Sequence, residues 1–209
     1  MAELESAMKR LKSKAVGQDR VHNDMLKNLS PKNRVHLLHL FNSLYANAFV
    51  PDSWKIAIII PLLKPGKPAN EASSYLPISL TSCIGKLFER LVTNRLSWFV
   101  ESRSIVGSEQ AGFRTHRSTI DHVIKLDHDI KECFVNKKST VAVFLDINKA
   151  YDTVWVKGLL FKLAKLGIHG NCLGWLANFL QNRSVCVRLG SYTSETRKIN
   201  NGVPQGAPR

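Results

Sequence analysis

The chain has 209 residues, which is room for one sizeable domain or two small ones. Thirty Lys and Arg residues against 16 Asp and Glu give a formal net charge of +14, while the hydrophobic fraction of 44% is ordinary for a protein with a buried core. This basic surplus points to a polyanionic partner, most often nucleic acid. The alternatives are a solvated basic surface and, less favoured, a membrane surface, because no single amphipathic helix concentrates the charge.

Cysteine spacing and the N-terminus bear on the cellular compartment. The cysteines are far apart and show no Cys-x-x-Cys or paired histidine spacing: they are Cys83, Cys133, Cys172 and Cys186. This pattern argues against a zinc site and a disulfide framework and favours reduced thiols. The first residues are charged and lack an apolar signal core, and no apolar run approaches the length that spans a bilayer. We therefore expect an intracellular protein, in the nucleus or the cytoplasm, that is not secreted and has no membrane partner.

Apolar residues recur at helical spacing in six segments. In chain order, the predicted helices cover residues 4–11, 37–48, 84–99, 119–134, 159–166 and 173–180. The second helix should stop near Pro51, the fourth should start at Ser118 or Thr119, and Gly167 can terminate the fifth. Residues 13–30 are polar and irregular, so no helix is predicted there.

Strand signals are fewer. Residues 56–63 are branched and apolar and predict a strand, which Pro61 should place at a sheet edge or end early. Residues 140–145 predict another strand, and alternation over residues 185–199 predicts a β-hairpin that turns at Gly190-Ser191. Helices and strands occupy separate stretches, so the predicted fold class is α+β.

The end of the predicted strand at 140–145 carries the most informative residue. Asp146 follows an apolar run, where a rigid strand can hold a carboxylate facing a cleft. Mg²⁺ prefers hard oxygen ligands, and enzymes that join nucleotides stabilise the attacking and leaving oxygens with two such ions about 3.5–4 Å apart. A strand-end Asp that only caps the next turn is the alternative, and it would be favoured for an isolated Asp.

The flanking residues decide this choice through a family resemblance. Residues 144–152, FLDINKAYD, resemble the first palm motif of the reverse transcriptases of non-LTR (LINE-like, Jockey/CR1-type) retrotransposons. Residues 202–206, GVPQG, are similar to the next palm motif of that family, and residues 110–119, QAGFRTHRST, to a fingers motif. Earlier fingers motifs are matched in order at residues 54–57, 64–67 and 74–80. The resemblance covers essentially the whole chain.

The resemblance implies the fingers and part of the palm of a right-hand polymerase, with the thumb absent. It implies a helical N-terminal extension over residues 1–50, fingers over 51–139 and a partial palm over 140–209. The family's third core motif, an aromatic-x-Asp-Asp hairpin, is missing, and no Asp-Asp pair occurs anywhere in the sequence. One carboxylate cannot hold two ions, so we expect the isolated 209 residues not to polymerise.

The same resemblance implies roles for single residues. Asp146 is the catalytic carboxylate and a metal ligand, and the backbone carbonyl of Ile147 can bind the second ion. Tyr151 lies beneath the incoming sugar and excludes a 2′-hydroxyl, although it could also be a core aromatic. The implied cofactor is Mg²⁺, with Mn²⁺ possible, and the implied partners are an RNA template, a DNA primer and dNTPs.

Other residues are assigned to the nucleotide and to the nucleic acid. Gln205 and Gly206 would line the nucleotide pocket, where a Gly/Pro turn lets backbone amides approach a ligand closely. Arg114 is the candidate phosphate contact, because its planar guanidinium can donate two parallel hydrogen bonds. The candidate nucleic-acid contacts are Lys64, Lys67 and Arg117; the last could instead simply be solvated.

Several positions depart from the family pattern. Leu76 stands where the family usually has Arg, and Ala207 where it usually has Ser. In the entry segment, whose usual form is close to Lys-Ala-Pro-Gly-Pro-Asp-Gly, the departures are Val16, Gln18 and Arg20. Loss of both prolines should loosen this segment, in which we expect a turn at residues 17–19.

Two other functions compete with a reverse transcriptase fragment. A non-catalytic RNA- or DNA-binding remnant of a retroelement would keep only the basic surface. A viral RNA-dependent RNA polymerase would share the metal chemistry, but the bulky Tyr151 argues against it because ribonucleotides carry a 2′-hydroxyl. Oligomeric state does not follow from the sequence.

Overall fold

The computed structural model describes residues 1–11 and 16–203, and its contacts divide the chain into two compact units. The first unit contains Met1–Arg95 and the described residues from Lys149 onward, and the second contains Leu96–Asn148. The units are defined by contacts within the chain, so the functional segments expected at residues 1–50, 51–139 and 140–209 stay a prediction. None of the described helices combines the length and hydropathy needed to cross a bilayer.

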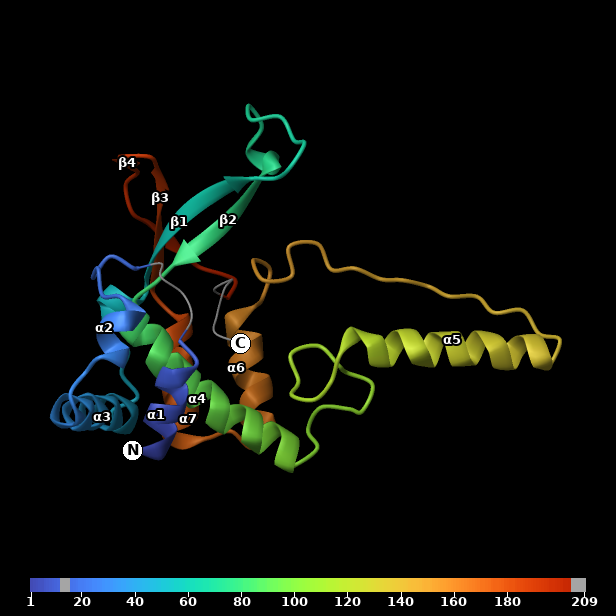
Figure 1. The fold of residues 1–209 in the computed structure, drawn as a ribbon, viewed down its shortest axis with the longest axis horizontal. Coiled ribbons are helices and arrows are strands. Elements are labelled where there is room, and N and C mark those ends of the chain that lie inside the picture. Colours follow the sequence, from blue (N-terminus) through green and yellow to red (C-terminus); the bar gives the residue numbers. More distant parts are fainter. Residues whose placement is uncertain (12–15, 204–209) are drawn as a thin grey trace. The chain divides into compact units, whose positions relative to one another are not determined.

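The first unit is built on a five-stranded sheet (Figure 1). Its strands are β1 (Ile56–Leu63), β2 (Tyr75–Leu80), β3 (Arg183–Leu189), β4 (Tyr192–Thr193) and β5 (Arg197–Ile199). The order is β2-β1-β3-β4, and β5 also pairs with β3. Only the β1–β3 pair is parallel, and it joins strands that are more than 100 residues apart in the sequence.

β1 shows how two prolines fit into a sheet. Its predicted bounds, residues 56–63, are confirmed. Pro61 lies opposite Pro77 of the antiparallel neighbour β2, and the parallel neighbour β3 pairs with β1 only at Ile56–Ile59. Pro61 therefore lies where β1 has one neighbour, and the missing N–H of each proline costs least when it would point away from the partner strand.

The remaining strand predictions gave a mixed result. The hairpin predicted over residues 185–199 is confirmed by β3, β4 and β5, whereas β2 was not predicted. The strand predicted at 140–145 is wrong, because residues 138–147 have no regular structure. Val141, Phe144 and Leu145 are 86%, 82% and 92% exposed. β-branched residues favour a strand only when a neighbour supplies hydrogen bonds and a packing surface, and no described strand pairs with this segment.

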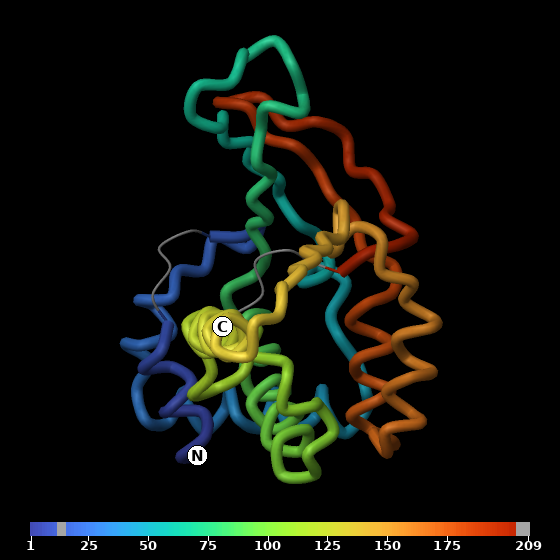
Figure 2. Tube along the Cα trace, turned by 90° about the vertical axis from the view of Figure 1, so that its right-hand side faces the viewer, coloured from blue at the N-terminus to red at the C-terminus, as the bar shows by residue number. Residues whose placement is uncertain are grey.

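All six predicted helices are confirmed, with bounds shifted by a few residues. The structure contains α1 (Ala2–Lys9), α2 (Asn23–Lys27), α3 (Pro31–Ala46), α4 (Cys83–Ser102), α5 (Thr119–Val135), α6 (Val156–Lys165) and α7 (Gly170–Leu180), with short 3₁₀ turns η1 (Asp52–Trp54) and η2 (Ala72–Ser74). The short α2 lies in the segment that was expected to be irregular. α6 and α7 run side by side after the chain returns to the first unit (Figure 2). Gly167, at φ +88°, follows α6 as predicted.

The core of the first unit is a chain of aromatic contacts. Phe88 of α4 stacks on Phe41 of α3, with ring centroids 4.8 Å apart, and meets Trp175 of α7 edge-on at 5.3 Å. Trp175 in turn stacks on Phe179 at 5.1 Å, and Trp54 of η1 lies edge-on to both Phe41 and Phe88. These rings join three helices that are far apart in the sequence, and aromatic pairs of this kind add about 0.5–1.5 kcal/mol each beyond the area they bury.

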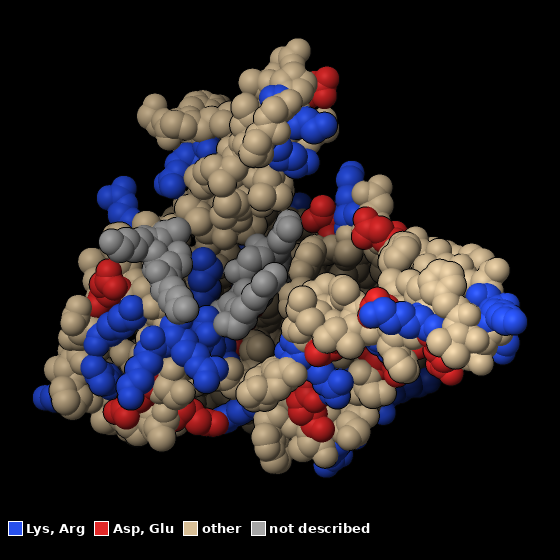
Figure 3. Space-filling model, turned by 45° about the vertical axis from the view of Figure 1, so that its right-hand side comes forward, with Lys and Arg blue, Asp and Glu red and all other residues tan. Residues whose placement is uncertain are grey.

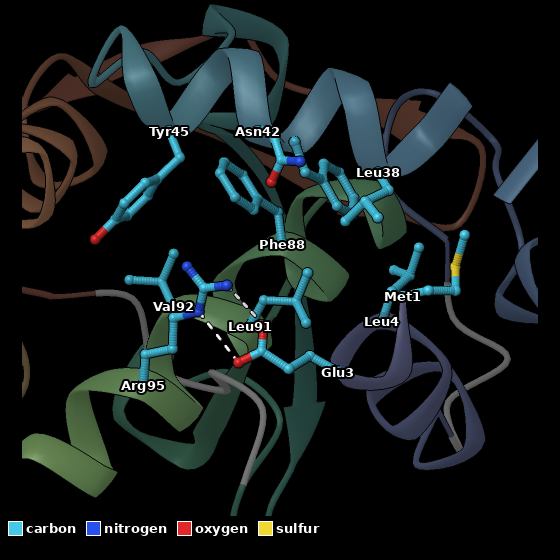
Figure 4. A pocket seen from close by; sticks show the side chains of 11 residues that line it. Met1, Glu3, Leu4, Leu38, Asn42, Tyr45, Phe88, Leu91, Val92 and Arg95 are labelled. Carbon is cyan, nitrogen blue, oxygen red and sulfur yellow. Dashed lines mark hydrogen bonds and ion pairs between the residues drawn. The ribbon is translucent and has the colours of Figure 1, made fainter. Parts of the chain in front are cut away.

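A small cavity lies beside this core, between α1, α3 and α4 (Figure 4). It measures about 40 Å³, which is room for a few water molecules and not for a nucleotide. Arg95 closes one side, donating from Nε and Nη2 to the two carboxylate oxygens of Glu3 at 3.2 and 2.6 Å. The cavity is therefore a packing feature of the helices rather than a substrate pocket.

The second unit is organised differently. It contains the C-terminal turns of α4, a loop, α5 and the extended segment that follows. α5 begins with a capping box, in which Ser118 and Asp121 satisfy each other's backbone amides, and this confirms the predicted start. α5 buries no residue, and among the described residues of this unit Ala111 is the one buried apolar side chain. Hydrophobic burial within the unit therefore contributes little to its order.

One carboxyl in the first unit keeps its proton to a much higher pH than a solvated glutamate does. Burial raises the pKa of Glu89, in α4, to about 7, and the attraction of Arg183, Lys86 and Arg90 only partly opposes this. Because the folded-state pKa lies above the unfolded value, the folded chain binds the proton more tightly. The stability this provides is fully present below about pH 4.5 and is lost as the pH rises through about 7.

We predict that Glu89→Gln, which keeps the uncharged shape, removes this loss. The variant should be more stable than the parent at pH 8 by roughly 1–3 kcal/mol and closely similar to it at pH 4.5. Urea unfolding followed by tryptophan fluorescence at both pH values measures the difference. An identical pH dependence in the two proteins would show that Glu89 is fully solvated or paired in the folded chain.

Candidate functional site

Two motif segments that are fifty residues apart in the sequence meet in the first unit. The backbone N–H of Val203 donates to the carbonyl of Tyr151 at 2.8 Å, and that of Gly202 donates to the carbonyl of Val154 at 3.0 Å. These bonds hold the start of the segment 202–206 against the turn at residues 148–153, which ends the segment 144–152. The structure therefore brings into contact residues of two motifs that the sequence had linked only through resemblance to the same family.

Gly202 is required at this junction for two separate reasons. Its φ of +87° lies in the left-handed region, which strains any residue with a Cβ. A Cβ built at this position would lie 2.9 Å from the carbonyl oxygen of Tyr151 and 3.0 Å from Cα of Asp152, closer than such atoms pack. The two backbones can approach this closely only because residue 202 has no side chain.

The turn on the other side of the junction is fixed locally. The carbonyl of Lys149 accepts hydrogen bonds from the amide of Asp152 at 2.9 Å and from both the amide and the hydroxyl of Thr153 at 3.1 Å. Lys149 itself has a φ of +52°. Tyr151, the predicted sugar-screening residue, is 37% exposed and is therefore not a core aromatic.

The predicted metal ligands lie in the other unit. Asp146 is exposed, Ile147 is 73% exposed, and both fall in the segment without regular structure. Among the described residues, no three His, Cys, Asp or Glu side chains gather as a metal cluster. The rigid strand end expected beneath Asp146 is therefore absent here. One carboxylate and one carbonyl are suitable oxygen donors for Mg²⁺, but the metal-binding role of these residues stays a prediction.

Gln205 and Gly206, the predicted pocket residues, lie outside the described residues. The description of this motif therefore ends at Val203.

Arg114, the predicted phosphate contact, already uses its guanidinium for hydrogen bonds within the chain. Its Nε and Nη2 donate to the two carboxylate oxygens of Glu101 at 2.9 and 2.7 Å, and its Nη1 donates to the carbonyls of Gly107 at 2.7 Å and Gln110 at 3.2 Å. Only 12% of the Arg114 side chain is exposed. These hydrogen bonds lower the pKa of Glu101 below its ordinary value, and the nearby charge of Arg117 acts in the same direction.

Glu101 is a residue that the sequence patterns did not single out. It lies in the last turn of α4, thirteen residues before its partner, and no local spacing rule pairs residues so far apart. A glutamate near a helix C-terminus is unfavourable for the helix dipole, and that mismatch is the one signal the sequence offered.

The predicted nucleic-acid contacts lie on exposed loops. Lys64 and Lys67 flank a tight turn between β1 and β2, in which the amide of Lys67 donates to the carbonyl of Lys64 at 3.2 Å and Gly66 has a φ of +71°. The Lys64 ammonium bonds to the carbonyl of Ser73 at 3.0 Å, whereas Lys67 and Arg117 are exposed. Basic side chains are spread over the face of the molecule drawn in Figure 3, in keeping with the net charge of +14.

The departures from the family pattern have structural counterparts. The turn expected at residues 17–19 is confirmed by a hydrogen bond from the backbone amide of Arg20 to the carbonyl of Gly17 at 3.2 Å. Arg20, which replaces a family glycine, has a φ of +55°, a conformation that costs of order 1 kcal/mol for a residue with a Cβ. Leu76 is 45% exposed on β2, opposite Leu62, and is therefore not a core residue.

Comparison with known proteins agrees with these motifs. Residues 63–209, more than half of the chain, match the family model described as reverse transcriptase (RNA-dependent DNA polymerase). The chain belongs to this family.

Three relatives show the kind of reverse transcriptase. The chain is 39% identical to the probable RNA-directed DNA polymerase from transposon BS of Drosophila melanogaster and 34% identical to the RNA-directed DNA polymerase from mobile element jockey of the same species, in each case over 93% of this chain and 21% of the relative. It is 29% identical to the Pol polyprotein of retrotransposable element R2 of Popillia japonica, over 99% of this chain and 28% of the relative. The resemblance to non-LTR retrotransposon reverse transcriptases is confirmed, and the chain spans between 21% and 28% of the length of these relatives.

The close backbone approach at Gly202 predicts that alanine destabilises the chain more at position 202 than at Gly190. A Cβ added at Gly190, which has a φ of +58°, would meet no atom within 4 Å, so Gly190→Ala carries only the left-handed strain, about 1 kcal/mol. Gly202→Ala adds a backbone collision and should cost roughly 2–4 kcal/mol in the free energy of unfolding. Urea denaturation of both variants measures this, and equal costs would show that the segments around 151 and 202 are not in contact.

Proposed function

We propose that this chain supplies the fingers and part of the palm of a retrotransposon RNA-directed DNA polymerase, which extends a DNA primer along an RNA template with dNTPs. The observation that carries the proposal is the junction of the two motif segments, in which Val203 bonds to Tyr151, at the end of residues 144–152, and Gly202 bonds to Val154. The family match over residues 63–209 supports it. On this proposal the N-terminal extension, fingers and partial palm cover residues 1–50, 51–139 and 140–209, in an intracellular setting.

The proposed chemistry assigns the oxygens of the first palm motif to metal. The carboxylate of Asp146 and the carbonyl of Ile147 would hold Mg²⁺, or Mn²⁺ in its place, because both groups are hard oxygen donors. Bound in pairs, such ions stabilise the attacking and leaving oxygens of an in-line transfer to the primer. Further carboxylates are needed for a second ion, and the sequence contains no Asp-Asp pair to supply them.

The remaining roles concern binding and orientation. Tyr151 would lie beneath the sugar and exclude a 2′-hydroxyl, and Gln205 with Gly206 would border the nucleotide. The proposed contacts of the template and primer backbones are Lys64, Lys67 and Arg117. A direct phosphate contact by Arg114 would require its guanidinium to exchange Glu101 for the phosphate, because the same donors serve both.

Nucleotide binding separates this proposal from a non-catalytic nucleic-acid-binding remnant. We predict that dNTP binding by the chain requires Mg²⁺ and weakens at least about tenfold in Asp146→Ala, as loss of a metal-site group typically does. Asp129→Ala is the matched control, because it removes an exposed carboxylate from α5 in the same unit. Titration of a fluorescent dNTP with and without Mg²⁺ gives the affinities. Binding that ignores both Mg²⁺ and Asp146→Ala would favour the remnant.

Catalysis by the isolated chain is a separate prediction. Because the sequence has Asp146 but no Asp-Asp pair, the 209 residues should show no primer extension on an RNA template with Mg²⁺ or Mn²⁺. Synthesis that disappears in Asp146→Ala would overturn this prediction and would mean that the chain finds its other metal ligands elsewhere. Nucleic-acid binding that weakens steeply with salt is expected under both functions, so it does not separate them.

A further inference from the structure

The loop between α4 and α5 is ordered without an apolar core. α5 buries no residue, and Ala111 is the one buried apolar side chain among the described residues of the second unit. The contacts that tie this loop to its flanking helices are polar. Glu101, at the end of α4, pairs with Arg114, and Lys125 of α5 pairs with Glu109 at 2.7 Å. The conformation of the loop therefore depends on a few ion pairs and hydrogen bonds.

Arg114 makes most of these contacts. Four hydrogen bonds of 2.7–3.2 Å use Nε, Nη1 and Nη2 and join Glu101 to the carbonyls of Gly107 and Gln110. A guanidinium has five N–H donors in a fixed fork, and these four hydrogen bonds engage all three of its nitrogens. With 12% of its side chain exposed, Arg114 has little surface left for a phosphate.

The backbone on both sides of Arg114 also needs an external constraint. Phe113 and His116 have φ values of +62° and +60°, in the left-handed region that residues with a Cβ rarely adopt. Such conformations persist only where surrounding contacts hold them. The bonds from Arg114 to the carbonyls of Gly107 and Gln110 supply that constraint on the Phe113 side, since they close the loop across Phe113.

We propose that Glu101 is a positioning residue of this polymerase fragment: it holds Arg114 as a clamp that folds the loop 107–117 and presents Arg117 to a nucleic-acid phosphate. Arg117 is exposed and follows Arg114 by three residues in the same loop, so the bonds that fix Arg114 also restrict where Arg117 can lie. Its charge acts together with Arg114 to lower the pKa of Glu101. The nucleic-acid part of this proposal rests on the proposed function. The clamp itself does not.

Hydrogen exchange of the backbone amides in residues 107–117 tests the clamp on the full 209-residue chain. Glu101→Gln and Arg114→Gln should each raise exchange there at least about tenfold, because each removes the charge-assisted pair while keeping a polar side chain. Arg95→Gln is the matched control: it breaks the bidentate pair with Glu3 in the first unit and should leave these amides unchanged. Unchanged exchange in both clamp variants would overturn the proposal.

Binding of an RNA–DNA primer-template duplex, measured by fluorescence anisotropy at several salt concentrations, tests the division of roles. Arg117→Gln should lower the slope of log affinity against log salt by about one, as loss of one phosphate contact does, without changing exchange. The double variant Glu101→Arg with Arg114→Glu restores an ion pair with reversed charge. It should recover part of the exchange protection and keep the parental slope, because Arg117 is intact.

Two results would contradict the assignment of the phosphate contact. One is a lower salt slope in Arg114→Gln with exchange protection intact, which would make Arg114 itself the phosphate ligand. The other is a charge-reversed double variant that regains protection from amide exchange but not the parental slope of log affinity against log salt. If the parent chain does not bind the duplex at all, the proposed function fails, and the exchange arm still decides whether Glu101 and Arg114 form the clamp.

Discussion

The aromatic contacts centred on Phe88 are the interaction on which the first unit depends. Phe88 meets Phe41 from the N-terminal helices and Trp175 from the segment that returns after the second unit. Trp175 is 2% exposed and Phe41 likewise, so the contact closes the core between the two halves of the unit. Removing a buried aromatic side chain from such a core typically costs about 3–5 kcal/mol, a large part of the stability of a small domain.

The position of the sheet and of the motif junction follows from this core. Once α7 packs on α4, β3 begins three residues later and can add to β1 as a parallel neighbour. Arg183 helps to fix the start of β3, since its guanidinium lies 4.8 Å from the Phe179 ring and donates to the Phe179 carbonyl at 3.1 Å. β5 pairs with β3 and leads directly to Gly202, which brings the segment 202–203 against residues 149–154.

The second unit is held mainly by polar contacts and not by a buried aromatic core. Exposed ion pairs contribute little to stability because water screens them, so the loop tied by Glu101, Arg114, Glu109 and Lys125 is held mainly by the several bonds of one guanidinium. The extended residues 138–147 have no regular structure, and their apolar side chains are exposed. A strand without a neighbour satisfies neither its backbone hydrogen bonds nor its packing preferences, so β propensity alone does not order it.

The sequence by itself determined the features that depend on residues close together along the chain. Helical periodicity predicted six of the seven α-helices, the branched run at 56–63 predicted β1, and Ser118 predicted the start of α5, because each signal spans at most a few turns of chain. The motif order likewise identified the family. Tertiary structure alone decided the parallel β1–β3 pair, the closeness that requires glycine at 202, the failure of the strand before Asp146 and the pairing of Glu101 with Arg114. Each of these depends on residues far apart in the chain. Their stability is set by contacts with a distant segment, and no local sequence pattern encodes such contacts.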